Sequence, residues 1–161
     1  LGCVAVCSNG TTPVYSGTYV TMDQASRFLD IKDGIIIDSN GSTGKYVIPS
    51  FVGGQLIHGI GEKAFYAGDY TTAMREAVIP DSITEIPELA FAGDFALETV
   101  VLHKGITQIG LQAFCDNPRL EKIIFWGTLE EWEAIEKCSP WVSSDTDIVL
   151  VCTDGTKTIE D

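Results

Sequence analysis

The chain has 161 residues, of which 45% are apolar and 20% are charged, and this composition is typical of a folded globular domain. Its 23 acidic and 10 basic residues give a net charge of -13, which argues against nucleic acid or an anionic membrane surface as a partner. The longest apolar runs, such as IIFW at 123–126, are far shorter than the roughly 20 residues of a membrane-spanning helix, so no transmembrane segment is predicted.

The first 45 residues do not repeat, and we expect them to form an N-terminal cap. Residues 22–30 (MDQASRFLD) have the pattern of a short helix. GIIID at 34–38, followed by SNGSTGK, predicts a strand that runs into a turn. Residues 1–20 show no clear period and are assigned no element.

Five cysteines make an odd count, so at least one thiol stays free unless it pairs with another chain. Cys3 and Cys7 are close enough to form a disulfide, and Leu1-Gly2-Cys3 has features of a lipoprotein cleavage site, so pairing and lipidation are both open. The first residue is Leu rather than Met, as expected of a mature or trimmed segment.

Residues 46–126 contain a repeat. The stretches 77–99 and 100–122 agree at 8 of 23 positions, and six of the eight are apolar. A looser copy at 46–76 carries extra residues around Gly53-Gly54, and a fourth copy starts at residue 123. Adjacent repeats of this length predict a solenoid, in which each unit covers the apolar edge of the unit before it.

Each unit begins with a strand pattern. Leu97, Val100 and Leu102 form an LxxVxL motif, the start of the leucine-rich repeat consensus, so Val100 and Leu102 should face the core and Val101 should face outward. We expect these strands to align into a parallel sheet on the concave face. The outward positions are then Val47, Val78, Val101 and Ile124, flanked by Pro49, Pro80, His103 and Trp126.

This outward apolar stripe is the candidate binding surface. Apolar surface with Trp126 and His103 suits the centre of an interface with a protein or glycan partner. Strand propensity explains outward Val and Ile equally well.

The second half of each unit, such as ITEIPELAF, predicts a turn and a short helix on the convex side. Phe65, Phe91 and Phe114 recur within it and are expected to form a buried structural column. The consensus Asn or Cys of the turn is replaced by Ser82, Gly105 and Thr128, so no asparagine ladder is expected there.

Residues 127–161 predict a C-terminal cap. Thr128 and Glu131 have capping-box spacing, and Leu129, Trp132 and Ile135 follow at intervals of three, which predicts an amphipathic helix within 127–137. IVLVC at 148–152 predicts a strand that ends at the turn residues Asp154-Gly155.

The sequence shows no pattern of catalytic or metal-binding residues. His58 and His103 lie in different repeats without a cysteine or acidic cluster at ligand spacing, and Asp145 and Asp147 are too sparse for a calcium loop. Phosphate-binding and nucleophile-elbow motifs are absent from the sequence. We therefore expect no enzyme activity, no cofactor and no metal.

The arrangement IPxxIxxIxxxAF at a 23-residue period resembles the BspA-like surface-antigen leucine-rich repeats. The resemblance extends from VIPSFVGG to the ending GTLEEWEAI, Trp141 and VCTDG, and covers about residues 30–156. Pro87 and His103 depart from the pattern, at positions where other repeats have glycine and proline.

The resemblance implies an α/β solenoid with short parallel strands on the concave face, short helices or turns on the convex face, and distinct caps. It also implies a secreted or cell-surface bacterial protein that binds other molecules without catalysis. The alternative is a structural spacer in a larger surface protein, with no ligand of its own.

Overall fold

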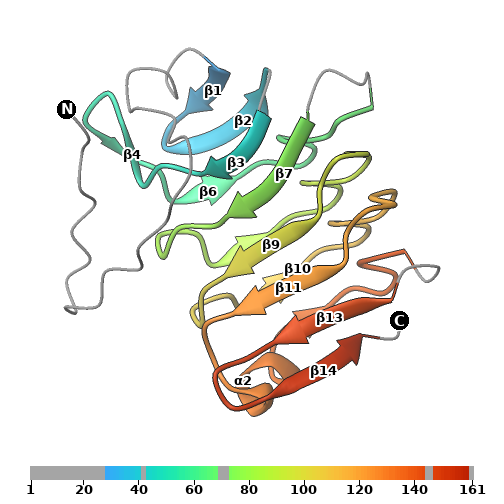
Figure 1. The fold of residues 1–161 in the computed structure, drawn as a ribbon. Helices are drawn as coiled ribbons and strands as arrows, with labels where there is room; N and C mark the ends of the chain where they lie inside the picture. The colour runs from blue at the N-terminus through green and yellow to red at the C-terminus, as the bar shows by residue number, and fades with distance from the viewer. Residues whose placement is uncertain (1–27, 41–42, 69–72, 144–146, 160–161) are drawn as a thin grey trace, which may run out of the picture.

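Parallel strands stacked side by side form the main sheet of the computed structural model, which describes residues 28–40, 43–68, 73–143 and 147–159 (Figure 1). The sheet has six strands in the order β14-β13-β11-β9-β7-β3. They are β3 (Thr43–Val47), β7 (Ala73–Val78), β9 (Thr99–Leu102), β11 (Lys122–Phe125), β13 (Ile148–Val151) and β14 (Thr156–Ile159). Neighbours from β3 to β13 are parallel, and β14 pairs antiparallel with β13. Each coil of the chain thus adds one strand, as expected of a solenoid.

The opposite side of the coils is built from short strands and turns. β8 (Glu85–Ile86), β10 (Gln108–Ile109) and β12 (Glu136–Lys137) form a second parallel sheet. The turn predicted in this half of the unit is present, but the described residues form no helix there, because alternate backbone amides bond to the next coil. Phe65 N–H donates to the Ala90 carbonyl at 2.9 Å, and Phe91 N–H donates to the Ala113 carbonyl at 2.9 Å.

A third sheet covers the N-terminal end of the described solenoid. Its strands are β1 (Leu29–Lys32), β2 (Ile35–Ser39) and β6 (Gly59–Ile60), in the order β1-β2-β6. β2 confirms the strand predicted at 34–38. Of the helix predicted at 22–30, Phe28 has helical backbone and Leu29 already begins a strand. Residues 22–27 lie outside the described residues, as do Cys3 and Cys7.

The extra residues of the first repeat form a hairpin. β4 (Phe51–Val52) pairs antiparallel with β5 (Gln55–Leu56), and Gly53 and Gly54 connect them with φ of 59° and 84°. Two successive residues in the left-handed region require glycine or a close substitute, which explains this part of the sequence.

Aromatic rings run through the core from coil to coil. Phe65 and Phe91 stack with centroids 4.9 Å apart, and Phe91 and Phe114 stack at 5.5 Å, with all three rings buried. At one end of this column Tyr46 makes a T-shaped contact with Phe65, and at the other end Trp141 makes a T-shaped contact with Phe114. Trp132 in turn contacts Trp141, with ring centroids 5.8 Å apart. Stacked rings of this kind join each coil to the next.

Two buried polar residues, Asp94 and Asn117, hold the turns that follow Phe91 and Phe114 in the chain. Asn117 donates to the carbonyls of Phe91 and Phe114, and its side-chain oxygen accepts from the N–H of Asp94. The Asp94 carboxylate in turn accepts from the N–H of Met74 and of Ala96. The turns are therefore held by Asp94 and Asn117, three residues after Phe91 and Phe114, and this recurrent polar position is the sequence signal that would have found them.

The C-terminal cap contains the helix α2 (Leu129–Glu133). Its capping box confirms the prediction: Thr128 N–H donates to the Glu131 carboxylate at 2.8 Å, and Glu131 N–H donates to Thr128 Oγ1 at 3.1 Å. The helix ends before residue 137, because Glu136 and Cys138 donate to carbonyls of the preceding coil. β13 confirms the strand predicted at 148–152, with Ile148 and Leu150 buried.

Candidate binding surface

The solvent-facing side of the six-stranded sheet, here called the sheet face, is set by the LxxVxL pattern. Leu97, Val100 and Leu102 are fully buried on the other side of the sheet. Alternation along the strand then turns the residue between Val100 and Leu102 to the sheet face. The same pattern in every coil produces rows of equivalent residues that run across the strands.

One of these rows is apolar. The strand register places Val47 beside Val78, Val78 beside Val101, and Val101 beside Ile124, so the four predicted positions do lie in one row. Val151 on β13 extends the row next to Ile124. Val151 is not among the predicted surface residues, although the alternation of Leu150 and Val151 in the predicted strand places it in this row.

The exposure of this row differs from the expectation at two positions. Val47 is 40% exposed and Ile124 is partly exposed, but Val78 is only 7% and Val101 only 3% exposed. Val78 and Val101 are neighbours on the interior strands β7 and β9. The expected continuous exposed stripe is therefore wrong at the centre of the sheet.

Besides Val47 on β3, the sheet face has exposed or partly exposed apolar side chains on β11 and β13 and directly after β11. Trp126 is 40% exposed at the end of β11, and Val149 on β13 is 41% exposed. Ile124 and Val151 lie between them in the fold and are partly exposed. We call Ile124, Trp126, Val149 and Val151 the β11–β13 patch.

His103 is not part of the exposed surface. Its ring is only 6% exposed, with Nε2 2.7 Å from the Ile83 carbonyl and Nδ1 3.0 Å from the Gly105 nitrogen. The expectation that His103 faces a partner is corrected, because both ring nitrogens are used in bonds to the backbone of two coils. Trp126, at the equivalent position one coil later, is exposed instead.

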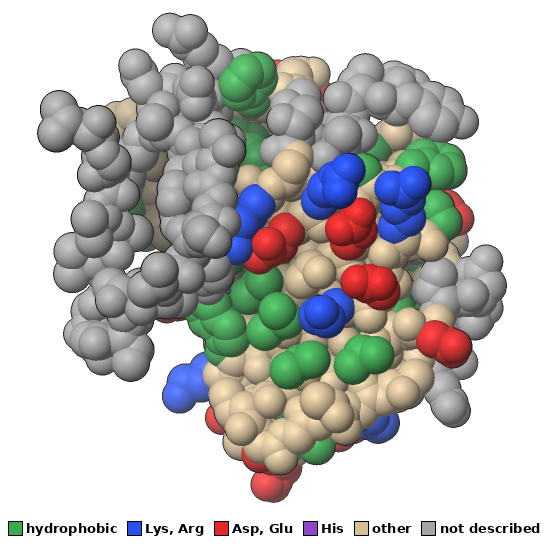
Figure 2. Space-filling view, in the orientation of Figure 1, with side chains coloured by type: hydrophobic (Ala, Val, Ile, Leu, Met, Phe, Trp, Pro, Cys, Tyr) green, Lys and Arg blue, Asp and Glu red, His purple; other side chains and the backbone are tan. Residues whose placement is uncertain are grey.

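Charged side chains occupy the other part of the sheet face. Figure 2 shows them together above the hydrophobic side chains. Lys45 and Glu76 form an ion pair at 2.7 Å, and Arg75 lies 3.7 Å from Glu98. The charges of both signs make this part of the surface polar without giving it one strong sign.

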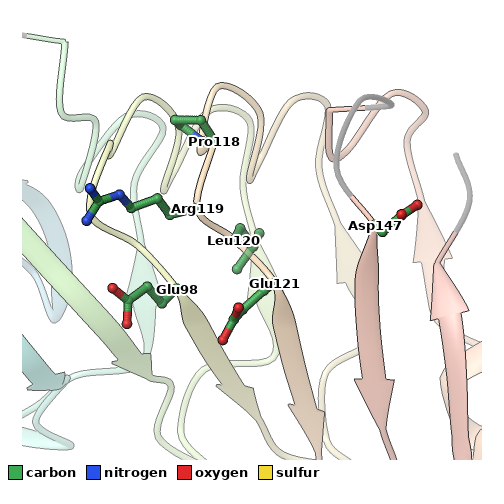
Figure 3. A pocket seen from close by; sticks show the side chains of 6 residues that line it. All are labelled: Glu98, Pro118, Arg119, Leu120, Glu121 and Asp147. Carbon is green, nitrogen blue, oxygen red and sulfur yellow. The ribbon is translucent and has the colours of Figure 1, made fainter.

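A hollow of 380 Å³ opens where the strands begin (Figure 3). It is lined by Glu98, Pro118, Arg119, Leu120, Glu121 and Asp147. The hollow is wide and lies at the surface, so it offers polar contacts to a large partner rather than an enclosed site for a small substrate.

The described residues show no arrangement of side chains for metal binding: no group of three His, Cys, Asp or Glu among them could hold an ion. His58 lies 3.1 Å from the carbonyl of Asp33, in a coil other than that of His103. No helix in the described part of the chain is long and apolar enough to cross a membrane.

The chain matches a known family of repeats. Residues 45–139, more than half of the chain, match the family model described as BspA type Leucine rich repeat region, with 6 copies. No curated protein and no solved structure matches the chain.

Proposed function

The chain belongs to the BspA-type leucine-rich repeat family, and on this premise we propose that it is a protein-binding module of a secreted or cell-surface bacterial protein, without catalytic activity. Repeats of this family suggest a role in protein interaction. A solenoid presents one broad surface built from equivalent positions of successive coils, and such surfaces suit large partners.

The observation that carries the proposal is the β11–β13 patch. Trp126 and Val149 expose about two fifths of their surface on adjacent strands, and Ile124 and Val151 extend the apolar area between them. Tryptophan is among the residues that contribute most to protein interfaces, and polar residues commonly surround such anchors. The charged part of the sheet face supplies polar contacts of this kind.

A binding screen of the purified protein against immobilised matrix proteins, mucins and glycans tests the proposal. For any protein that binds, we expect Trp126→Ala to weaken binding by at least about tenfold, because the variant removes the largest exposed anchor of the patch. Leu111→Ala is the matched control, since Leu111 is an exposed apolar residue outside the sheet face.

Three outcomes would contradict the proposal. Equal binding by folded Trp126→Ala and wild-type protein would place the partner elsewhere. Binding to glycans but not to proteins would change the class of ligand. Silence across the whole panel would favour a spacer, whose surface carries no ligand.

A further inference from the structure

The turn that follows β9 contains a buried histidine whose two ring nitrogens each bond to a backbone group. Gly105 N–H donates to His103 Nδ1 at 3.0 Å, and a nitrogen that accepts this bond carries no hydrogen. The hydrogen of the neutral ring is therefore on Nε2, which donates to the Ile83 carbonyl at 2.7 Å. The ring thus links its own turn to the turn of the preceding coil.

The repeat itself shows that this turn is specialised. The coil before it has Pro80 and Ser82 at the positions of His103 and Gly105. A Cβ atom added to Gly105 would lie 2.8 Å from His103 Cε1 and 2.9 Å from Nδ1. The imidazole therefore needs glycine two residues later, and the coil without histidine has no glycine there.

An acceptor for a second ring hydrogen lies nearby. Asp81 Oδ1, on the preceding coil, is 3.9 Å from His103 Nδ1, and the Asp81 side chain is 84% exposed and so has room to move. The other charged residue of the turn is Lys104, which is exposed. The following coil has Trp126, Gly127 and Thr128 at the equivalent level, and none of the three changes charge at ordinary pH.

We propose that His103 is an acid-responsive switch in which Nδ1 exchanges one partner for another. In the neutral state Nδ1 accepts from Gly105 N–H. When a proton from solvent binds Nδ1, the nitrogen becomes a donor, the bond to Gly105 is lost, and Nδ1–H pairs with the Asp81 carboxylate. The bond from Nε2–H to Ile83 is kept in both states, so the ring stays in place while the turn opens.

The turn is joined to the β11–β13 patch. Trp126 N–H donates to the carbonyl of Leu102, the residue directly before His103, at 2.9 Å. An effect of acid on partner binding would rest on the proposed function, but the switch itself does not, and it is tested without a partner.

NMR of the ¹⁵N-labelled protein between pH 8 and pH 5 tests the switch. We expect the protection factor of the Gly105 amide against hydrogen exchange to fall about tenfold, the typical effect of one lost hydrogen bond, along the same curve as the His103 ring titration. The Ile106 amide, which bonds to the His103 carbonyl, should keep its protection. In Asp81→Asn the change at Gly105 should move to lower pH, because the charged partner is lost.

The preceding coil supplies a control that keeps the fold. The double variant His103→Pro, Gly105→Ser gives the turn after β9 the residues that the preceding coil has there, Pro80 and Ser82. The pH-dependent change at residue 105 should disappear in this variant. The proposal is overturned if Gly105 keeps its protection while His103 becomes protonated, or if residue 105 responds equally in the double variant.

Discussion

Tyr46 is the residue at which the aromatic column meets a polar atom. Its ring packs against the edge of Phe65, and the side chain is almost fully buried. The hydroxyl group has no hydrogen-bond partner among the described residues. Burial raises the pKa of this phenol to about 12. The buried hydroxyl of Tyr46 thus destabilises the folded state, and the destabilisation grows at alkaline pH.

Tyr46→Phe should stabilise the protein by about 1 kcal/mol at pH 7, because the variant removes a buried hydroxyl that makes no bond. Above pH 10 the unfolded phenol loses its proton while the folded one keeps it until about pH 12, so wild-type stability should fall through this window by roughly 2 to 3 kcal/mol. Urea unfolding at several pH values measures both effects. The variant should lack this fall, whereas Tyr66→Phe, at an exposed ring, should keep it. An identical alkaline loss in Tyr46→Phe would contradict the argument.

At the scale of elements, structure that is held by local hydrogen bonds is predictable, and structure whose backbone bonds to another coil is not. The start of α2 was predictable, because Thr128 and Glu131 cap it through local contacts. Its end was not, because Glu136 and Cys138 bond to the preceding coil, and no local pattern encodes that choice. The helix predicted in the second half of each unit does not form for a related reason: alternate amides there bond to the next coil.

The residue types in these turns also gave no indication of their backbone conformation. Lys63, Leu89 and Gln112 precede the Ala-Phe pair of their coils and have φ of 60°, 56° and 55°. None is a glycine, so the sequence shows no sign of a left-handed residue there. The amides of Leu89 and Gln112 donate to the next coil, which helps to hold a backbone shape that the residues alone would not adopt.

The candidate surface was predictable in direction but not in exposure. Period-two alternation placed Val47, Val78, Val101 and Ile124 in one row, and the register agrees. Whether a side chain in the row meets solvent depends on its neighbours on other strands, which periodicity does not describe. His103 is the clearest example, because its ring nitrogens bond to the backbone of Ile83 and Gly105 and the side chain is buried.

Asn117→Asp tests the polar pair that joins the turns. The aspartate loses both donor bonds to the Phe91 and Phe114 carbonyls and buries a charge, so we expect a loss of about 3 to 5 kcal/mol at pH 7. Part of the loss should be recovered near pH 4 relative to wild type, where a protonated carboxyl can donate again. Pro118→Ala, at the exposed neighbouring residue, should change stability by less than about 0.5 kcal/mol. Chemical unfolding measures all three, and a neutral Asn117→Asp would contradict the assigned role.

At the scale of the whole molecule, charge opposes compactness. The chain carries a net charge of -13, while the ion pairs on the described surface are mostly exposed and contribute little. Self-repulsion among the acidic groups should therefore outweigh these pairs.

Raising KCl from 20 mM to 300 mM should increase the free energy of unfolding by about 1 kcal/mol, because salt screens the repulsion between acidic groups. Urea unfolding at each salt concentration provides the measurement. A decrease in stability would mean that the ion pairs dominate, and Lys45→Met, which removes the shortest pair of the sheet face, would then reduce the salt effect.

The contact between Trp132 and Trp141 has a consequence for how this protein can be observed. The chain has three tryptophans, and all of them lie between residues 126 and 141. Two are buried against each other in the C-terminal cap, and Trp126 faces solvent. Tryptophan fluorescence, excited selectively over that of tyrosine, therefore reports on the last coils alone. Loosening of the first coils would leave the emission spectrum unchanged, whereas a partner that covers the β11–β13 patch would shift the emission of Trp126 to shorter wavelength without any label.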